Sequence, residues 1–162
     1  MVTPLPFVNK NNYQLKLSAE CVQLNVYARS AEEAIRKACE PLVLLKRVRP
    51  AYINDVILRE ERWPTGIPTN PGIAIPHAEN YDNTITSTIA SCVLANSIPF
   101  RQMGSKDQLV DVRILFILAI KEPDIQVDVI SNLMRFLTGK SAINNLIKSK
   151  TQQEFIDQFE GK

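Results

Sequence analysis

His77 is the only histidine in this chain of 162 residues, and it ends the short apolar segment GIAIPH at positions 72–77. A neutral imidazole has a nucleophilic nitrogen at cellular pH, because its unperturbed pKa is about 6.5. Such a nitrogen can attack phosphorus directly and form a covalent intermediate. Pro76 has a fixed φ and favours an extended conformation at Ile75, so the imidazole should leave the end of a strand in a defined direction. The segment therefore predicts a site built around one reactive ring nitrogen.

Other interpretations of the same residues stay open at this point. A lone histidine can be a structural residue whose ring is hydrogen-bonded in the interior. A phosphorylated histidine, by contrast, carries close to two negative charges and needs donors around it. Arg59, Arg62, Thr65 and Thr69 are the nearby candidates. The two arginines could instead be the solvated end of an amphipathic helix, and the two threonines could only shape a loop.

The first half of the chain predicts one strand and two helices before the histidine. A strand is expected at 21–27, where apolar and polar residues alternate. A helix should follow from Ser30, which stands three residues before Glu33 in the spacing of a capping box. Pro41 is expected to kink or divide that helix, because proline lacks the N–H that the helix needs. A second helix is predicted from near residue 50 to residue 61, with its apolar positions on one face.

A loop and two strands are predicted in the middle of the chain. Residues 63–72 contain so many prolines and glycines that we expect no regular structure there, only a shaped loop just before the histidine. Strands are expected at 86–95 and 110–120. The second of these is almost wholly apolar, which is typical of a strand in the centre of a sheet.

The remainder is predicted to be helical. One helix should begin at Asp124 and stop at Gly139, and another should begin at a capping box formed by Thr151 and Glu154. The elements together predict an α/β fold in which helices pack on a small sheet. We expect a loosely held lead-in at residues 1–14 and one domain at 15–162, a length that suits a single core.

Composition excludes several classes of protein. The chain is 45% hydrophobic and 22% charged, with a net charge of +2 from well-mixed acids and bases, so a strongly basic nucleic-acid-binding face is not expected. Its longest apolar run, at 114–120, is far shorter than the roughly 20 residues that span a bilayer, so we expect no membrane insertion. The three cysteines are widely spaced, which favours the cytoplasm over an oxidising compartment.

Other kinds of catalytic site lack their motifs. One histidine and no paired cysteines leave no zinc site, and no Asp-rich loop predicts a calcium site. No glycine-rich phosphate loop or dinucleotide fingerprint is present, so no metal and no cofactor is expected. Residue counts alone leave a Ser-His-Asp hydrolase open, although the chain has no nucleophile-elbow motif.

The segment IAIPH at 73–77 resembles the phosphorylation motif of IIA domains of the sugar phosphotransferase system (PTS), in the fructose–mannitol superfamily. The order of Arg59-Glu60, WPTGI at 63–67, the IAIPH segment and then Glu79 is most similar to galactitol-type IIA proteins. The resemblance implies a mixed sheet flanked by helices, the α/β sandwich of mannitol- and fructose-type EIIA domains.

The resemblance also implies a function and partners. His77 would accept a phosphoryl group on Nε2 from the phosphocarrier HPr and pass it to a cysteine of an EIIB protein, which phosphorylates a sugar or polyol entering through the membrane component EIIC. Arg59 matches the family's arginine and would stabilise the phosphoryl group. Mannitol-type members have a second histidine where this chain has Asp124, and that departure argues for the galactitol subgroup. We expect Asp124 to cap its helix or to point away from the site.

A second functional hypothesis shares the same histidine. The domain could be a signalling module, similar to nitrogen-type IIA proteins or to the IIA-like domains of regulators, whose phosphorylation state controls a partner. A third is a structural or binding protein in which His77 never reacts. The WPTG segment favours the transport relay, while the sequence leaves the identity of the sugar open.

Overall fold

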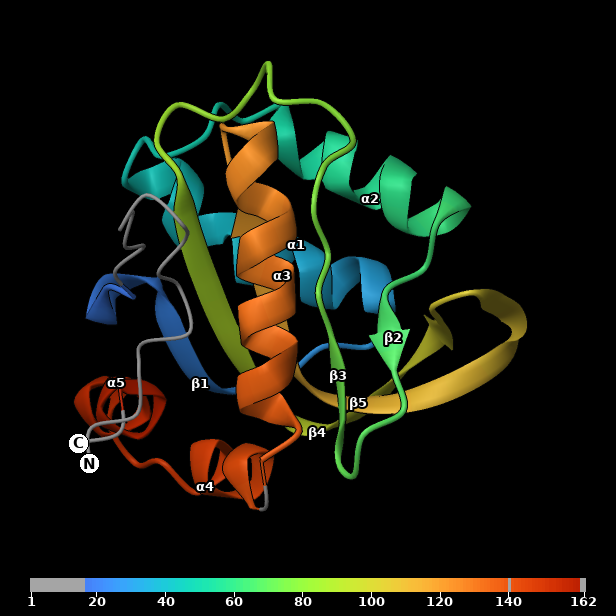
Figure 1. The fold of residues 1–162 in the computed structure, drawn as a ribbon, viewed down its shortest axis with the longest axis vertical. Helices are drawn as coiled ribbons and strands as arrows, with labels where there is room; N and C mark the ends of the chain where they lie inside the picture. The colour runs from blue at the N-terminus through green and yellow to red at the C-terminus, as the bar shows by residue number, and fades with distance from the viewer. Residues whose placement is uncertain (1–16, 140, 161–162) are drawn as a thin grey trace.

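Two long antiparallel strands, β4 (Thr88–Gln102) and β5 (Ser105–Ala119), form the centre of the fold (Figure 1). Gly104 lies in the tight turn between them with a φ of 78°, a left-handed conformation that glycine adopts without a steric penalty. β4 continues past the end of the predicted range 86–95, and β5 begins before the predicted range 110–120. The computed structural model describes residues 17–139 and 141–160, so the predicted lead-in at 1–14 lies outside the described residues.

Three shorter strands complete a mixed sheet. β1 (Val22–Val26) pairs parallel with β4, and β3 (Gly72–Ala74) pairs parallel with β5. β2 (Gly66–Ile67) lies antiparallel to β3 and meets the end of β4 at one residue pair. β5 therefore has strands on both sides, which confirms its predicted place inside the sheet.

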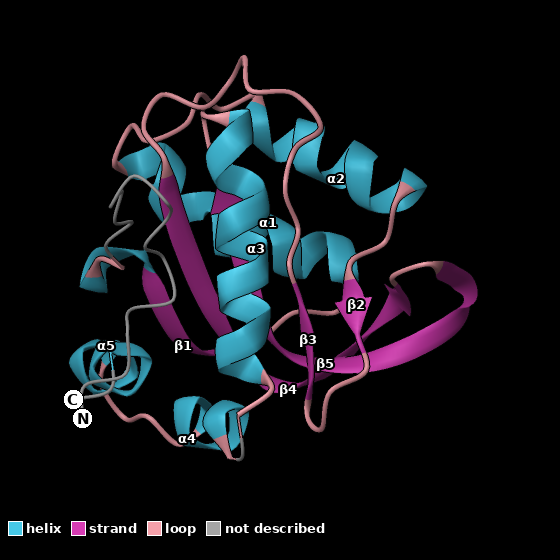
Figure 2. Cartoon of the chain, in the orientation of Figure 1, coloured by secondary structure: helices cyan, strands magenta, loops and turns pink. Residues whose placement is uncertain are grey.

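Helices cover both faces of the sheet, and Figure 2 shows α1 (Ala31–Leu44) and α3 (Pro123–Leu137) on opposite sides of the strands. One core contains the buried residues of α1 and α2 (Tyr52–Arg62) with one face of β4 and β5. The other contains the buried residues of α3, α4 (Ala142–Ile147) and α5 (Gln152–Glu160) with the opposite face. Alternate residues of β5, such as Leu115 and Phe116, contribute to opposite cores, as the two-residue period of a strand requires. The predicted sheet with flanking helices is confirmed.

The predicted helix starts at Ser30 and Thr151 are confirmed. The Ser30 hydroxyl accepts a hydrogen bond from the Glu33 N–H at 3.1 Å, and the Thr151 hydroxyl accepts one from the Glu154 N–H at 3.0 Å. Each satisfies a backbone donor that the first turn of a helix leaves without an intrahelical partner.

Pro41 was predicted to kink or divide the first helix. It does not divide the helix, since α1 continues through this residue to Leu44. Pro41 has no N–H for the carbonyl of Lys37, four residues earlier. The side-chain amide of Gln23, on β1, donates to that carbonyl at 3.0 Å. A distant residue thus supplies the hydrogen bond that proline removes.

Two more predictions are corrected. The segment 63–72 is not wholly irregular, because Gly66–Ile67 form β2 and Gly72 begins β3. Asp124 is not the N-cap of its helix: α3 begins at Pro123, so its N-cap is Glu122, and Asp124 lies exposed in the first turn. In the described part of the chain, no helix is long and apolar enough to cross a membrane. Cys21, Cys39 and Cys92 are buried free thiols.

Candidate functional site

β3 carries the chain to His77 between two neighbouring strands. Gly72 begins β3 where it approaches β5 so closely that a Cβ atom would overlap the carbonyl oxygen of Asp111. After Ala74 the regular pairing ends, but the carbonyl of Pro76 still accepts a hydrogen bond from the Leu118 N–H of β5 at 3.1 Å. The residue directly before the histidine is therefore attached to the central strand.

The ring of His77 is held in one tautomer by its own backbone. Nδ1 lies 2.8 Å from the carbonyl oxygen of Ile75, two residues earlier. A carbonyl oxygen can only accept a hydrogen bond, so Nδ1 must carry the proton. In the neutral ring, Nε2 then has the free lone pair, and it is the nucleophilic nitrogen.

The surroundings of His77 keep its ring neutral. The residue is only 5% exposed. The pKa of His77 is lowered from 6.5 to about 4. Burial is the main cause, the hydrogen bond to Ile75 opposes it, and the positive charge of Arg59 adds to it. At neutral pH the lone pair of Nε2 is thus available without a separate base.

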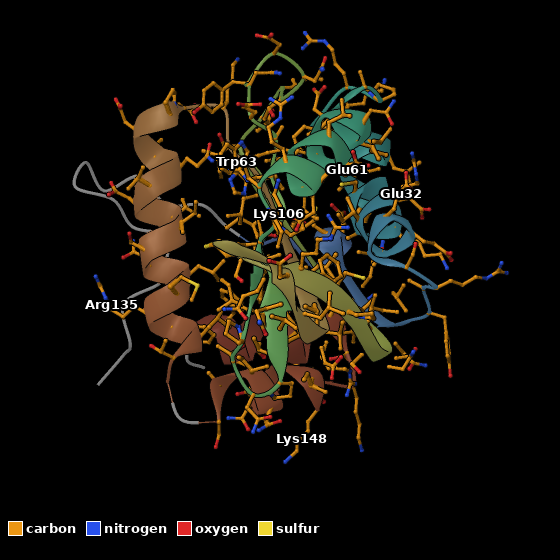
Figure 3. All side chains as sticks on the ribbon, turned by 90° about the vertical axis from the view of Figure 1, so that its right-hand side faces the viewer. Glu32, Glu61, Trp63, Lys106, Arg135 and Lys148 are labelled. Carbon is orange, nitrogen blue, oxygen red and sulfur yellow. The ribbon has the colours of Figure 1, made fainter. Side chains whose placement is uncertain are left out.

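Arg59 lies in the last turn of α2, close enough for its charge to act on His77. Its Nη1 donates to the carbonyl oxygen of Trp63 at 3.1 Å, a bond that ties the guanidinium to the end of the helix. Arg59 also lines a pocket of about 330 Å³ with Arg62, Trp63 and Lys106. Figure 3 shows Trp63 and Lys106 on the side of the molecule where α2 ends beside the β4–β5 turn. Three cationic side chains, of Arg59, Arg62 and Lys106, thus line one pocket.

The other predicted residues have different environments. Thr65 is buried, and its hydroxyl is hydrogen-bonded to Glu60 and to the backbone N–H of Ile75. Thr69 donates to the carbonyl oxygen of Pro71 at 2.8 Å and so shapes the loop before β3. Arg62 forms an exposed ion pair with Glu79 at 3.7 Å. The positive charge of Arg59 thus acts on the pKa of His77, and Thr65 is linked to His77 through Ile75.

Glu60 belongs to the motif that begins at Arg59, but the sequence alone assigns it no role of its own. Its carboxylate accepts from the N–H of Thr65 at 2.7 Å and from its hydroxyl at 2.6 Å. The signal that could have found it is the five-residue spacing from Glu60 to Thr65 across the end of a helix. That spacing predicts a contact only once the turn at Trp63 and Pro64 is known.

One family of known proteins matches nearly the whole chain. Residues 16–162 match the family described as the phosphoenolpyruvate-dependent sugar phosphotransferase system, EIIA 2. The chain belongs to this family. The motif at 73–77 had predicted this family.

The relatives of this EIIA protein include mannitol-specific proteins. It is 30% identical over 149 residues to the mannitol-specific EIICBA component of Escherichia coli K12, covering 91% of this chain and 22% of that protein. The chain thus spans about a fifth of the length of this relative. The galactitol subtype predicted from the motif spacing is not confirmed by these matches.

Solved structures of EIIA proteins have the same fold. The crystal structure of IIA mannitol from E. coli superposes with a TM-score of 0.75 at 28% identity, over 90% of this chain and 99% of that one. A complex of mannitol enzyme IIA with phosphorylated enzyme IIB, also from E. coli, gives a TM-score of 0.74 at 28% identity, over 91% of this chain and 99% of that chain. The described fold is therefore the mannitol-type EIIA fold.

Proposed function

We propose that this EIIA protein accepts a phosphoryl group from phospho-HPr on Nε2 of His77 and passes it to a cysteine of an EIIB protein. The observation that carries the proposal is the hydrogen bond from Nδ1 of His77 to the carbonyl oxygen of Ile75. It leaves Nε2 as the nitrogen with the free lone pair. Burial supports the same role, since it keeps the ring unprotonated at neutral pH.

The transfer is an in-line displacement at phosphorus. The lone pair of Nε2 forms the new N–P bond while the bond from phosphorus to the donor nitrogen breaks, and its electron pair returns to the donor. The ring of His77 gains positive charge in this step. The carbonyl oxygen of Ile75, already hydrogen-bonded to Nδ1, stabilises that charge without any proton transfer.

Arg59 is proposed to stabilise the phosphoryl oxygens during both transfers. Negative charge spreads over these oxygens in the transition state, and a guanidinium fixed before the reaction stabilises it without reorganisation. The bond from Arg59 to the carbonyl of Trp63 leaves its other N–H groups available for this contact. Arg62 is assigned no such role, because its charge is paired with Glu79 on the surface.

The acceptor is proposed to be an EIIB protein that serves an EIIC transporter for galactitol or a related polyol. The complex of the E. coli mannitol IIA with phosphorylated IIB supports an EIIB partner for this fold. The mannitol-specific relative supports a polyol, and the WPTG segment with Asp124 in place of a second histidine favours galactitol. We place the relay in the cytoplasm, in keeping with three free thiols, and assign it to a domain at 15–162.

A reconstituted relay tests this function. The purified protein and its His77→Ala variant are incubated with enzyme I, HPr and labelled phosphoenolpyruvate, and galactitol-type or mannitol-type EIIB is then added. We expect label on the wild type alone and its passage to the cysteine of the galactitol-type EIIB. Passage only to the mannitol-type EIIB would overturn the galactitol assignment. Label that stays on His77 with both would favour the signalling function, and a wild type without label would overturn the relay.

A further inference from the structure

A chain of three hydrogen-bonded contacts leads from α2 to the reactive ring. The carboxylate of Glu60 accepts from the N–H and the hydroxyl of Thr65. The hydroxyl oxygen of Thr65 accepts from the N–H of Ile75 at 3.2 Å. The carbonyl oxygen of Ile75 accepts from Nδ1 of His77 at 2.8 Å. Ile75 is thus held at its N–H by one partner while its carbonyl holds the histidine.

Thr65 takes the place of a strand neighbour that Ile75 lacks. β2 and β3 pair Gly66 with Ala74 and Ile67 with Ile73, so the next pair in this register would be Thr65 with Ile75. The ladder stops before that pair, and the side-chain hydroxyl of Thr65 receives the N–H of Ile75 instead. Both residues are almost fully buried, so water cannot easily replace this bond.

The carboxylate of Glu60 sets the direction of the hydroxyl. Its two oxygens each accept one bond from Thr65, which an ionised carboxylate can do and an amide cannot. Because the hydroxyl hydrogen points to Glu60, a lone pair of the Thr65 oxygen is left for the N–H of Ile75. Arg59, the residue before Glu60, acts on the ring from the same helix end. One turn of α2 therefore orients Ile75 and places the guanidinium.

We infer that Glu60 and Thr65 are positioning residues, which fix Ile75 so that its carbonyl holds Nδ1–H of His77 and Nε2 stays the reactive nitrogen. Two further features restrict the backbone on the C-terminal side of Ile75. Pro76 follows it with a fixed φ, and the carbonyl of Pro76 is bonded to the Leu118 N–H of β5. The hydrogen bond to β5 fixes the chain directly after Ile75. The hydrogen bond from the Ile75 N–H to Thr65 fixes the chain on the N-terminal side of Ile75.

The first test measures the tautomer of His77 directly. Nitrogen-15 NMR of the free protein reports which ring nitrogen carries the proton, and it does so whether or not the protein is ever phosphorylated. We expect the wild type to show the Nδ1–H form. Glu60→Gln and Thr65→Val should both show a population of the Nε2–H form. Glu61→Gln, a change of the exposed neighbouring carboxylate, should keep the spectrum of the wild type.

The second test measures the rate of phosphoryl transfer from phospho-HPr and rests on the proposed function. Glu60→Gln and Thr65→Val should slow this transfer roughly 10- to 100-fold, since misplacing a reacting group has effects of this size. Thr65→Ser keeps the hydroxyl and should restore most of the rate. The midpoint of thermal unfolding, measured on each variant, separates these effects from loss of the fold.

The two tests separate a failure of the positioning role from a failure of the proposed function. Variants that keep the tautomer and the rate of the wild type, or that only unfold at lower temperature, would overturn the positioning role. If Thr65→Val does not fold, the test depends on Glu60→Gln, whose tautomer and transfer rate are compared with those of its control, Glu61→Gln. If the wild type takes no label from phospho-HPr, the proposed function fails, and the NMR comparison alone decides whether Glu60 and Thr65 position the ring.

Discussion

At the scale of single residues, His77 combines a fixed tautomer with a low proton affinity. The carbonyl of Ile75 holds Nδ1, while burial and the charge of Arg59 disfavour the protonated ring. An unperturbed histidine at pH 6 would be largely protonated and would lose its nucleophile. In this site the ring stays neutral well below that pH, so the nitrogen that we propose as the phosphoryl acceptor keeps its lone pair over the whole physiological range.

The first prediction concerns the titration of this ring. His77 should titrate with a midpoint near pH 4 in the folded protein, because burial lowers its pKa to about that value. An NMR titration of the imidazole resonances measures the midpoint, and with a single histidine in the chain the assignment is direct. A midpoint at the ordinary value of about 6.5 would contradict the burial of the ring.

The second prediction compares the two arginines at the end of α2. Arg59→Gln should slow phosphoryl transfer to His77 by roughly 100-fold, the usual effect of removing one preorganised donor from a transition state. It should also raise the pKa of His77, since the nearby positive charge is lost. Arg62→Gln is the matched control and should change the rate little, because Arg62 forms an exposed pair with Glu79. Equal losses in the two variants would exclude a special role for Arg59.

At the scale of elements, β3 positions the histidine because it is inserted closely between β2 and β5. Gly72 permits this approach: a Cβ atom there would overlap the Asp111 carbonyl and lie 2.5 Å from Cγ1 of Val110. The third prediction is that Gly72→Ala destabilises the protein by roughly 2 kcal/mol or more, as overpacking does when backbone must move. Urea unfolding measures the loss. Gly139→Ala, whose Cβ would lie 3.1 Å from its nearest atom, should cost less, and an equal cost would contradict the close approach.

Elements defined by local patterns could be predicted from the sequence, and those defined by distant contacts could not. The helix starts at Ser30 and Thr151 depend on neighbours three residues away, and they were correctly predicted. The continuity of α1 through Pro41 depends on Gln23 from another strand, and no local signal contains it. β2 was missed because it has two residues and exists only by pairing with its neighbours.

The candidate site also contains residues that a local motif predicts and residues whose contacts depend on the fold. His77 and Arg59 could be proposed from the sequence because each belongs to a motif with a recognisable type and spacing. The contact of Glu60 with Thr65 was not predicted, because it depends on how the chain turns between α2 and β2 and brings Thr65 back to the carboxylate. Thr65 was predicted to be either a donor near the histidine or a residue that shapes the loop, and only the structure connects it to Ile75.

At the scale of the whole molecule, the sheet separates two cores and the histidine lies where β3 leaves it. A buried histidine that stays neutral links the site to global stability. The unfolded chain binds a proton below about pH 6.5, while the folded protein binds it at His77 only near pH 4. The unfolded state therefore binds more protons between these values, and stability falls as the pH is lowered.

The fourth prediction is that His77 makes the free energy of unfolding fall as the pH is lowered. The stability that the neutral ring contributes is fully present above about pH 6.5 and is lost towards pH 4, by up to roughly 3 kcal/mol for a shift of this size. Urea unfolding of the wild type and His77→Gln across this range measures the difference. The raised pKa of Glu60 acts in the opposite direction, but it is present in both proteins and cancels. A difference that does not change with pH would contradict the prediction.

The most direct test of the central claim is to identify the phosphorylated atom. The protein is phosphorylated by enzyme I, HPr and phosphoenolpyruvate, and the phosphohistidine is then examined by nitrogen-15 and phosphorus-31 NMR. We predict a single phosphoryl group on Nε2 of His77, with Nδ1 still hydrogen-bonded to the carbonyl of Ile75. A phosphoryl group on Nδ1, or on any residue other than His77, would contradict it.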